Sequence, residues 1–314
     1  MAKGWSGSRV STWLNGGLFA AGATGFAYLM GYLYGDSVEK YSLPDGTITT
    51  LGSTLSSGRG SGTGMSNSGT AGYMAGGGET GNVPVTTVDK FAYSDDSCST
   101  LGTGLADTRT NQPCGFSNSG TAGYVGGGWS STGSDAIDSV DKFAFSNDSR
   151  STIAATLTAN TQYTTGMANS GTAGYTLGGY AGGNVDTVDK FAFSDDSVST
   201  LATGLSAANR QPAGMANSGT AGYCGGGYTA SAVDTVDKFA FSDDSRTTLA
   251  TGLSAASSAL MAWGDTGAAG YIAGGSGGSA INKFSFADDS RSSCGTLTSQ
   301  LSYVSTAANE GALA

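Results

Sequence analysis

A short phrase ending in tyrosine recurs six times along the chain, and its spacing constrains the fold more than any other feature. Four copies read SGTAGY, a fifth reads TGAAGY and a sixth, shorter one reads TGFAY; in chain order they end at Tyr28, Tyr73, Tyr124, Tyr175, Tyr223 and Tyr271. Successive tyrosines are 45, 51, 51, 48 and 48 residues apart. A period of about 50 residues that fills a chain is typical of a repeat architecture, in which every copy forms the same supersecondary unit.

One repeat, from Ala213 to Leu253, shows what that unit is. It contains four short runs, at 213–216, 220–225, 235–241 and 246–253, with Asn-Ser-Gly, glycine-rich and Ser-Asp-Asp-Ser segments between them. These segments have the residues that tight turns require. The runs alternate in character and are shorter than the roughly ten to twelve residues of a typical helix, which favours strands. Each repeat is therefore predicted to be a four-stranded antiparallel meander.

Six such meanders in succession predict an all-β fold, a six-bladed β-propeller. A double glycine follows the aromatic strand in five repeats, and the next strand reads VDKF in four repeats, VEKY at Val38–Tyr41 and INKF at Ile281–Phe284. This order of strand, turn, aromatic strand, Gly-Gly and aromatic strand resembles the kelch repeat over about nine-tenths of the chain. The resemblance implies kelch-like blades of the kind found in galactose-oxidase-type proteins.

The repeats divide the chain into two parts. Residues 19–314 are expected to form the propeller, closed by a C-terminal strand, because Ala307–Gly311 resembles the first-strand phrase at 215–219. Residues 1–18 have no counterpart in the repeats, and we expect them to dock on a larger assembly. Hydropathy alone would allow a signal peptide or a membrane span at 16–35. Because half of that stretch aligns with the later repeats, we expect neither.

Composition argues against several functions. The net charge of −10 and the pI near 4.3 oppose binding to nucleic acid. The chain has no histidine, which removes the commonest general base and metal ligand. The copper site of galactose-oxidase-like enzymes needs histidines, so this activity is excluded. We expect a protein that is not an enzyme and has no cofactor and no metal site.

Two recurrent features and the cysteines have structural or functional interpretations. Six of the seven lysines occupy one repeat position after Asp, Glu or Asn, which favours a ladder of ion pairs between strands. The paired aspartates of the Asp-Asp-Ser turns favour Asx-type turns, with divalent-cation binding as the alternative. The four cysteines lack metal-site spacing, and a disulfide between Cys98 and Cys114 is a further alternative to free thiols.

Any specific function should lie where the repeats differ. In a meander the loops alternate between two faces; one face carries the monotonous turns, and the other carries the second-to-third-strand loops and the links between blades. The varied loops hold aromatic residues beside glycine, and the links hold arginines. Exposed aromatic rings with adaptable polar neighbours suit stacking on sugars; packing against the next blade is the alternative. The candidate ligand-binding residues are Trp129, Tyr180, Tyr228, Arg109 and Arg210.

These features favour a non-enzymatic bacteriophage protein on the virion surface, as a tail-fibre, tail-associated or capsid-surface propeller. The near-identical Gly-, Ser- and Thr-rich repeats, the initial Met1, the lack of a visible leader and the non-repeat N-terminal segment motivate this hypothesis. Its partners would be other virion proteins and host-surface glycans. A secreted or cell-surface bacterial adhesin that binds glycans is the alternative, and an intracellular scaffold is a third hypothesis.

Overall fold

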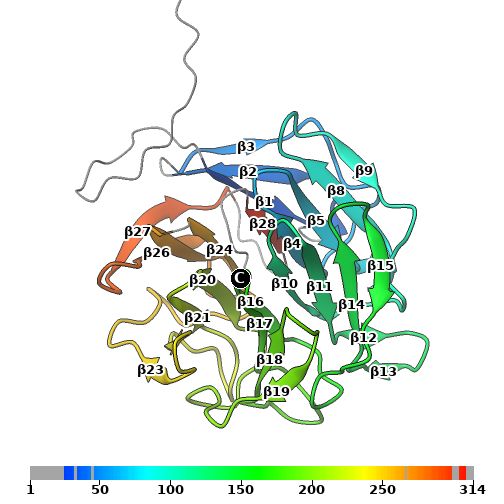
Figure 1. Cartoon of the computed structure of the whole chain (residues 1–314). Coiled ribbons are helices and arrows are strands. Elements are labelled where there is room, and N and C mark those ends of the chain that lie inside the picture. The colour runs from blue at the N-terminus through cyan, green and yellow to red at the C-terminus, as the bar shows by residue number, and fades with distance from the viewer. Residues whose placement is uncertain (1–24, 32–33, 44–45, 266, 299–303, 309–314) are drawn as a thin grey trace, which may run out of the picture.

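The computed structural model of the chain is a ring of six four-stranded antiparallel sheets around a central axis (Figure 1). It describes residues 25–31, 34–43, 46–265, 267–298 and 304–308. The regular elements within these ranges are β-strands, so the predicted all-β, six-bladed β-propeller is confirmed. Within the same ranges, no helix is long and apolar enough to cross a membrane.

The six blades are numbered here in chain order, and their strands run from the axis to the rim. They are β28–β1–β2–β3 (Ser305–Ala308, Phe26–Met30, Val38–Ser42, Ile48–Thr50), β4–β5–β8–β9 (Thr63–Asn67, Ala71–Ala75, Val88–Ala92, Cys98–Thr100), β10–β11–β14–β15 (Cys114–Asn118, Ala122–Gly126, Val140–Ala144, Ser149–Thr152), β16–β17–β18–β19 (Thr165–Asn169, Ala173–Leu177, Val188–Ala192, Val198–Thr200), β20–β21–β22–β23 (Ala213–Asn217, Ala221–Gly225, Val236–Ala240, Arg246–Thr248) and β24–β25–β26–β27 (Met261–Asp265, Ala269–Ala273, Ala280–Ser285, Arg291–Thr296). The loops of blades 2 and 3 add two small hairpins, β6–β7 (Gly78–Glu79, Val83–Pro84) and β12–β13 (Trp129–Ser130, Asp135–Ala136).

The fourth strand is shorter than the sequence indicates. In blade 5, β23 ends at Thr248, and the predicted continuation to Leu253 forms the link to the next blade. Leu253 is only 5% exposed and its backbone N–H donates to the carbonyl of Asp234. The leucine pattern at this position therefore marks a buried anchor of the link and not a longer strand.

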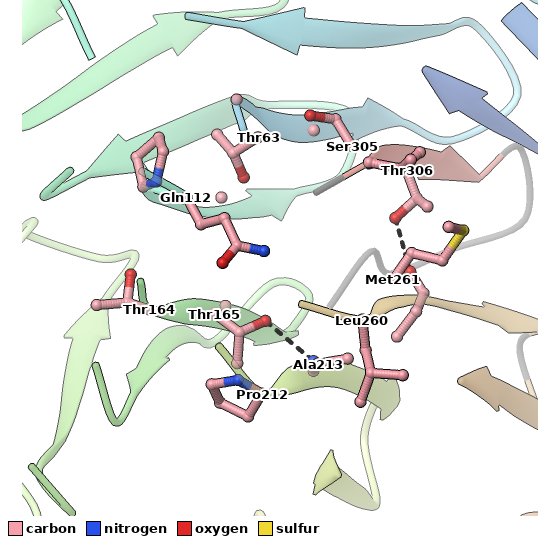
Figure 2. A pocket seen from close by; sticks show the side chains of 18 residues that line it. Thr63, Gln112, Thr164, Thr165, Pro212, Ala213, Leu260, Met261, Ser305 and Thr306 are labelled. Carbon is pink, nitrogen blue, oxygen red and sulfur yellow. Dashed lines mark hydrogen bonds between the residues drawn. The ribbon is translucent and has the colours of Figure 1, made fainter. Parts of the chain in front are cut away.

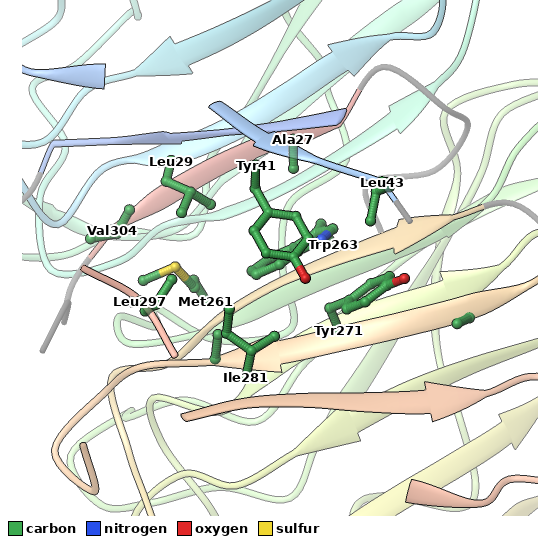
Figure 3. Packing of buried hydrophobic residues seen from close by; sticks show 12 residues of the cluster. Ala27, Leu29, Tyr41, Leu43, Met261, Trp263, Tyr271, Ile281, Leu297 and Val304 are labelled. Carbon is green, nitrogen blue, oxygen red and sulfur yellow. The ribbon is translucent and has the colours of Figure 1, made fainter. Parts of the chain in front are cut away.

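Blade 1 combines the two ends of the described chain. β28 pairs antiparallel with β1, with Ala27 opposite Ala308 and Met30 opposite Ser305. Aromatic rings fill the seam between blades 6 and 1: Trp263 stacks on Tyr271 of its own blade at 5.5 Å and meets Tyr41 of blade 1 in a tilted contact at 4.9 Å, measured between ring centroids (Figure 3). The pairing of β28 with β1 covers an edge of β1 that would otherwise be open to another strand, which removes a site of aggregation. The proposed docking segment, 1–18, and its boundary at 19 lie outside the described residues.

The strands nearest the axis approach one another closely. A Cβ atom at Gly166 in β16 would lie 2.0 Å from the carbonyl oxygen of Gly115 in β10, so only glycine allows this approach. The space on the axis is consequently small, about 70 Å³, and is bordered by residues such as Thr63, Gln112 and Thr165 (Figure 2). It can hold a few water molecules, each of which needs roughly 10–15 Å³.

The recurrent tyrosines and lysines join each blade to the next. Tyr175 Oη and Lys190 Nζ of blade 4 both donate to Asp244 of blade 5, at 2.9 and 2.6 Å. Asp244 is the second aspartate of an Asp-Asp-Ser turn and has a φ of 57°. Burial and the bond to Asp244 raise the pKa of Tyr175, so its hydroxyl remains a donor. The same arrangement occurs at Tyr28–Lys40–Asp96, Tyr73–Lys90–Asp148, Tyr124–Lys142–Asp196 and Tyr223–Lys238–Asp289.

The expected ion-pair ladder is thus present, but it connects neighbouring blades. The first aspartate of each turn has a different role: Asp95 Oδ1 accepts the backbone N–H of Ser97 at 3.1 Å, as in an Asx turn. Asp195, Asp243 and Asp288 make the equivalent bonds. Across the part of the chain that the structure describes, no three acidic, cysteine or histidine side chains form a group that could hold a metal ion.

Replacing one turn aspartate by asparagine should weaken a single junction. Asp244→Asn keeps a residue that tolerates positive φ but removes the charge that Lys190 and Tyr175 contact. Because the pair is about three-quarters buried, we expect a loss of about 1 kcal/mol in the free energy of unfolding, measured by urea denaturation. The loss should shrink at high salt. Asp243→Asn is the matched control with a smaller effect, and equal losses for both variants would contradict this role of the junction.

Candidate functional site

The face that carries the first-to-second and third-to-fourth-strand turns, called here the turn face, is occupied by contacts between blades. Besides the aspartate junctions, its Asn-Ser-Gly turns bond to one another: the backbone N–H of Ser119 donates to Ser170 Oγ at 3.1 Å, and that of Gly120 donates to Asn67 Oδ1 at 3.0 Å. Equivalent bonds start at Ser68 and Ser170. The polar groups of this face therefore stabilise the ring.

The opposite face, called here the loop face, carries a row of aromatic residues on three consecutive blades. Trp129, Tyr180 and Tyr228 occupy the same position, directly after the glycine pair of blades 3, 4 and 5. Each forms a β-bridge with the link that precedes its blade, to Thr110, Gln162 and Arg210. Each aromatic side chain is half-buried. Blades 2 and 6 have Gly78 and Ser276 at this position.

Arg210 joins two members of this row. Its guanidinium carbon lies 5.4 Å from the ring centroid of Tyr180 and 4.9 Å from that of Tyr228, within the range of cation–π attraction. Asn184 Nδ2 donates to the carbonyl of Tyr228 at 2.9 Å, which ties the loop of blade 4 to that of blade 5. The structure thus brings Tyr180, Arg210 and Tyr228 together as one fixed unit, and Trp129 lies in the same row on blade 3.

Beside Tyr180 the loop face is hollowed between blades 3 and 4. The hollow has a volume of about 460 Å³ and is bordered by Tyr180, Asp135, Asn160, Gln162 and Gly182, among others. Asn111 Nδ2 donates to Gln162 Oε1 at 2.7 Å, which orients the Gln162 amide. An aromatic ring, two amides and a carboxylate around one hollow can bind a ligand that has both apolar faces and many hydroxyl groups. Sequence reasoning missed Asp135, Asn160 and Gln162, although they lie in the links and loops that vary between repeats.

Arg109 does not share this location, which corrects its assignment to the binding surface. Its side chain is fully buried and bonds to the carbonyls of Gly127 and Ser139 at 2.9 and 2.7 Å, with Asp141 Oδ2 at 3.4 Å. Burial lowers the pKa of the Arg109 guanidinium, and the charge of Asp141 opposes this effect. Arg59 forms the equivalent pair with Asp89, at 2.9 Å. Arg109 is therefore part of the scaffold.

The cysteines also belong to the scaffold. Cys98 and Cys114 are free thiols, as are Cys224 and Cys294, so the alternative of a disulfide between the first two is not observed. Burial raises the pKa of Cys98 to about 11 and that of Cys114 to about 12. Thiols with such pKa values are poor nucleophiles near neutral pH, because the thiolate is the reactive form.

No protein-family model matches the chain, and no curated protein matches it. A function is therefore inferred from the fold and from the geometry of the loop face.

Replacing Arg109 and Arg210 by methionine, one at a time, should show that only Arg109 contributes strongly to the free energy of unfolding. Arg109→Met leaves the buried carboxylate of Asp141 without its guanidinium partner on Oδ2, and should lower the free energy of unfolding by about 3 kcal/mol. Arg210→Met, the matched control, removes a half-buried cation–π contact and should cost less than about 1 kcal/mol. Urea denaturation measures both; a larger loss for Arg210→Met would contradict this assignment.

Proposed function

We propose that this propeller is a non-enzymatic binding protein of a bacteriophage particle, displayed as a tail-fibre, tail-associated or capsid-surface component. In this proposal its loop face over blades 3–5 binds a glycan or a protein on the host surface. The observation that carries the proposal is the contrast between the two faces. Inter-blade bonds use the polar groups of the turn face, whereas the aromatic row and the hollow beside Tyr180 interrupt the repeat on the loop face.

The geometry of the loop face supports binding because its aromatic groups are held in place before any ligand arrives. The contacts of Arg210 with Tyr180 and Tyr228, and the bonds from Asn184, restrict the motion of these loops. Restricting the loops in advance reduces the conformational entropy that a ligand must otherwise overcome. A glycan suits the hollow because sugar rings offer apolar faces to aromatic side chains and hydroxyls to amides and carboxylates.

The assignment to a phage particle is supported by analogy. The near-identical Gly-, Ser- and Thr-rich repeats have the character of recent duplication, a habit of phage surface proteins. We further infer that the blades are of the kelch type, because the glycine pair has positive φ at both residues, 64° and 100° at Gly76 and Gly77, and precedes the V-D-K-F strand. In this proposal other virion proteins contact the N-terminal segment. The second candidate is a bacterial surface adhesin, which the glycan-compatible hollow equally favours.

Truncating a residue of the aromatic row should weaken ligand binding without unfolding the ring. On glycan arrays and on host cells, we expect Tyr180→Ala to weaken binding by about tenfold or more, and Trp129→Ala and Tyr228→Ala to weaken it less. Tyr34→Ala is the matched control, because Tyr34 is an exposed aromatic residue of blade 1 outside the row. Full binding by all three row variants, with normal melting temperatures, would contradict a binding role for this face.

The location of the protein separates the two candidates. We expect mass spectrometry of purified virions to detect the chain, and cell-surface fractions from uninfected bacteria to lack it. Detection only on or around bacterial cells would overturn the phage assignment and favour the adhesin.

A further inference from the structure

In the links between blades, different residues at one position make the same hydrogen bond. This position follows the buried leucine of the link by four residues. Its side chain donates to the carbonyl of the first glycine of the pair in four blades. The bonds are Arg59 to Gly76 at 2.9 Å, Arg109 to Gly127 at 2.9 Å, Asn209 to Gly226 at 2.7 Å and Ser257 to Gly274 at 3.0 Å. The two arginines also reach the aspartate of the third strand, and thereby neutralise a buried charge.

Blade 5 has a cavity in the place that the arginine guanidinium occupies in blades 2 and 3. Asn209 is too short to reach Asp237, and a cavity of about 210 Å³ is bordered by Leu205, Ser206, Asn209, Cys224 and Asp237, among others. In blade 2 the guanidinium of Arg59 contacts Asp89 at 2.9 Å and donates to the carbonyl of Gly76 at 2.9 Å. The volume is far larger than the roughly 10–15 Å³ that one water molecule needs.

The carboxylate that faces this space is buried but only partly matched by positive charge. Asp237 is 4% exposed; its Oδ2 accepts the backbone N–H of Ser206 at 2.7 Å, while Arg246 Nη1 lies 3.4 Å from its Oδ1. Blade 3 shows that such a carboxylate accommodates two guanidinium groups, because Asp141 has Arg150 near Oδ1 and Arg109 near Oδ2. Among the residues that the structure describes, no second cation pairs with Asp237 on its Oδ2 side.

A second group in the cavity wall also has unused bonding capacity. Asn209 is 9% exposed, and in the described part of the chain its buried Oδ1 atom has no hydrogen-bond partner. The cavity reaches the loop face, because Ser206 and Ala207 in its wall are exposed and Thr229 is partly exposed. A ligand can therefore enter from the face that varies between repeats.

We propose that this cavity binds a guanidinium cation, carried by a small molecule or by an arginine side chain of a partner. The bound group would take the place that Arg59 and Arg109 fill in blades 2 and 3. Blades 4 and 6 differ from blade 5 at this place. In blade 4 the space is only about 40 Å³, and the hydroxyls of Thr158 and Thr200 both bond to Asp189. In blade 6 the neutral Asn282 replaces the aspartate.

Calorimetric titration of the full chain with methylguanidinium chloride, at constant ionic strength, tests the proposal. We expect saturable binding that is at least about tenfold tighter than that of methylammonium, because a planar guanidinium matches a carboxylate and carbonyls together. Asn209→Arg supplies the group within the chain, so it should abolish the binding and raise the melting temperature. Asp237→Asn should weaken binding by at least about tenfold. Because Asp237→Asn can also impair folding, Asn209→Arg carries the decisive comparison.

Two results would overturn the proposal: no saturable binding to the unaltered chain, or equal binding by Asn209→Arg. A capped peptide Gly-Arg-Gly distinguishes the two sources of the cation. Binding of the peptide at least as tight as that of methylguanidinium indicates an arginine side chain of a partner, whereas exclusion of the peptide indicates a small free cation. Both outcomes require the cavity to bind guanidinium.

Discussion

The ring depends on one repeated contact, the carboxylate of a turn aspartate that receives a tyrosine hydroxyl and a lysine ammonium from the preceding blade. Asp244, with Tyr175 and Lys190, is the pattern for five described junctions. In four of these junctions the tyrosine ring also stacks on a phenylalanine of the next blade, as Tyr175 does on Phe241 at 5.4 Å. Since polar and apolar contacts occur at the same place, a blade is held in one register relative to its neighbour. The tyrosine phrase, the V-D-K-F strand and the Asp-Asp-Ser turn recur because all three take part in this contact.

This contact also determines where function can lie. The turn face has to repeat because each of its turns contacts two blades, and a change in one turn disturbs a junction. The loops of the other face connect strands within a blade or pass between blades, and they take no part in the aspartate junctions, so they can differ in length and composition. Blades 3–5 use this freedom most: they carry the aromatic row, the contacts of Arg210 and the cavity beside Asp237.

The sequence predicted the strands and blades well because their signals are local and recur six times. Partners were harder to predict. Lys90 follows Asp89 in the chain, but successive residues of a strand point to opposite faces, so Asp89 pairs with Arg59 while Lys90 pairs with Asp148. Arg109 and Arg210 lie in equivalent links. Arg109 lies one position closer than Arg210 to the buried leucine of its link. This difference places the side chain of Arg109 inside the blade and that of Arg210 on the loop face.

The sequence by itself determined the number of blades, the four-strand unit and which residues recur in every blade, because a periodic pattern of turns and strands has few ways to bury its apolar side chains. The tertiary structure alone decided which charges meet, which arginine is exposed and where space remains. Those outcomes depend on distances between blades about 50 residues apart in sequence, and on side-chain length in a shared volume. Asn209 illustrates this: its identity is visible in the sequence, but the cavity that it leaves beside Asp237 exists only in the folded ring.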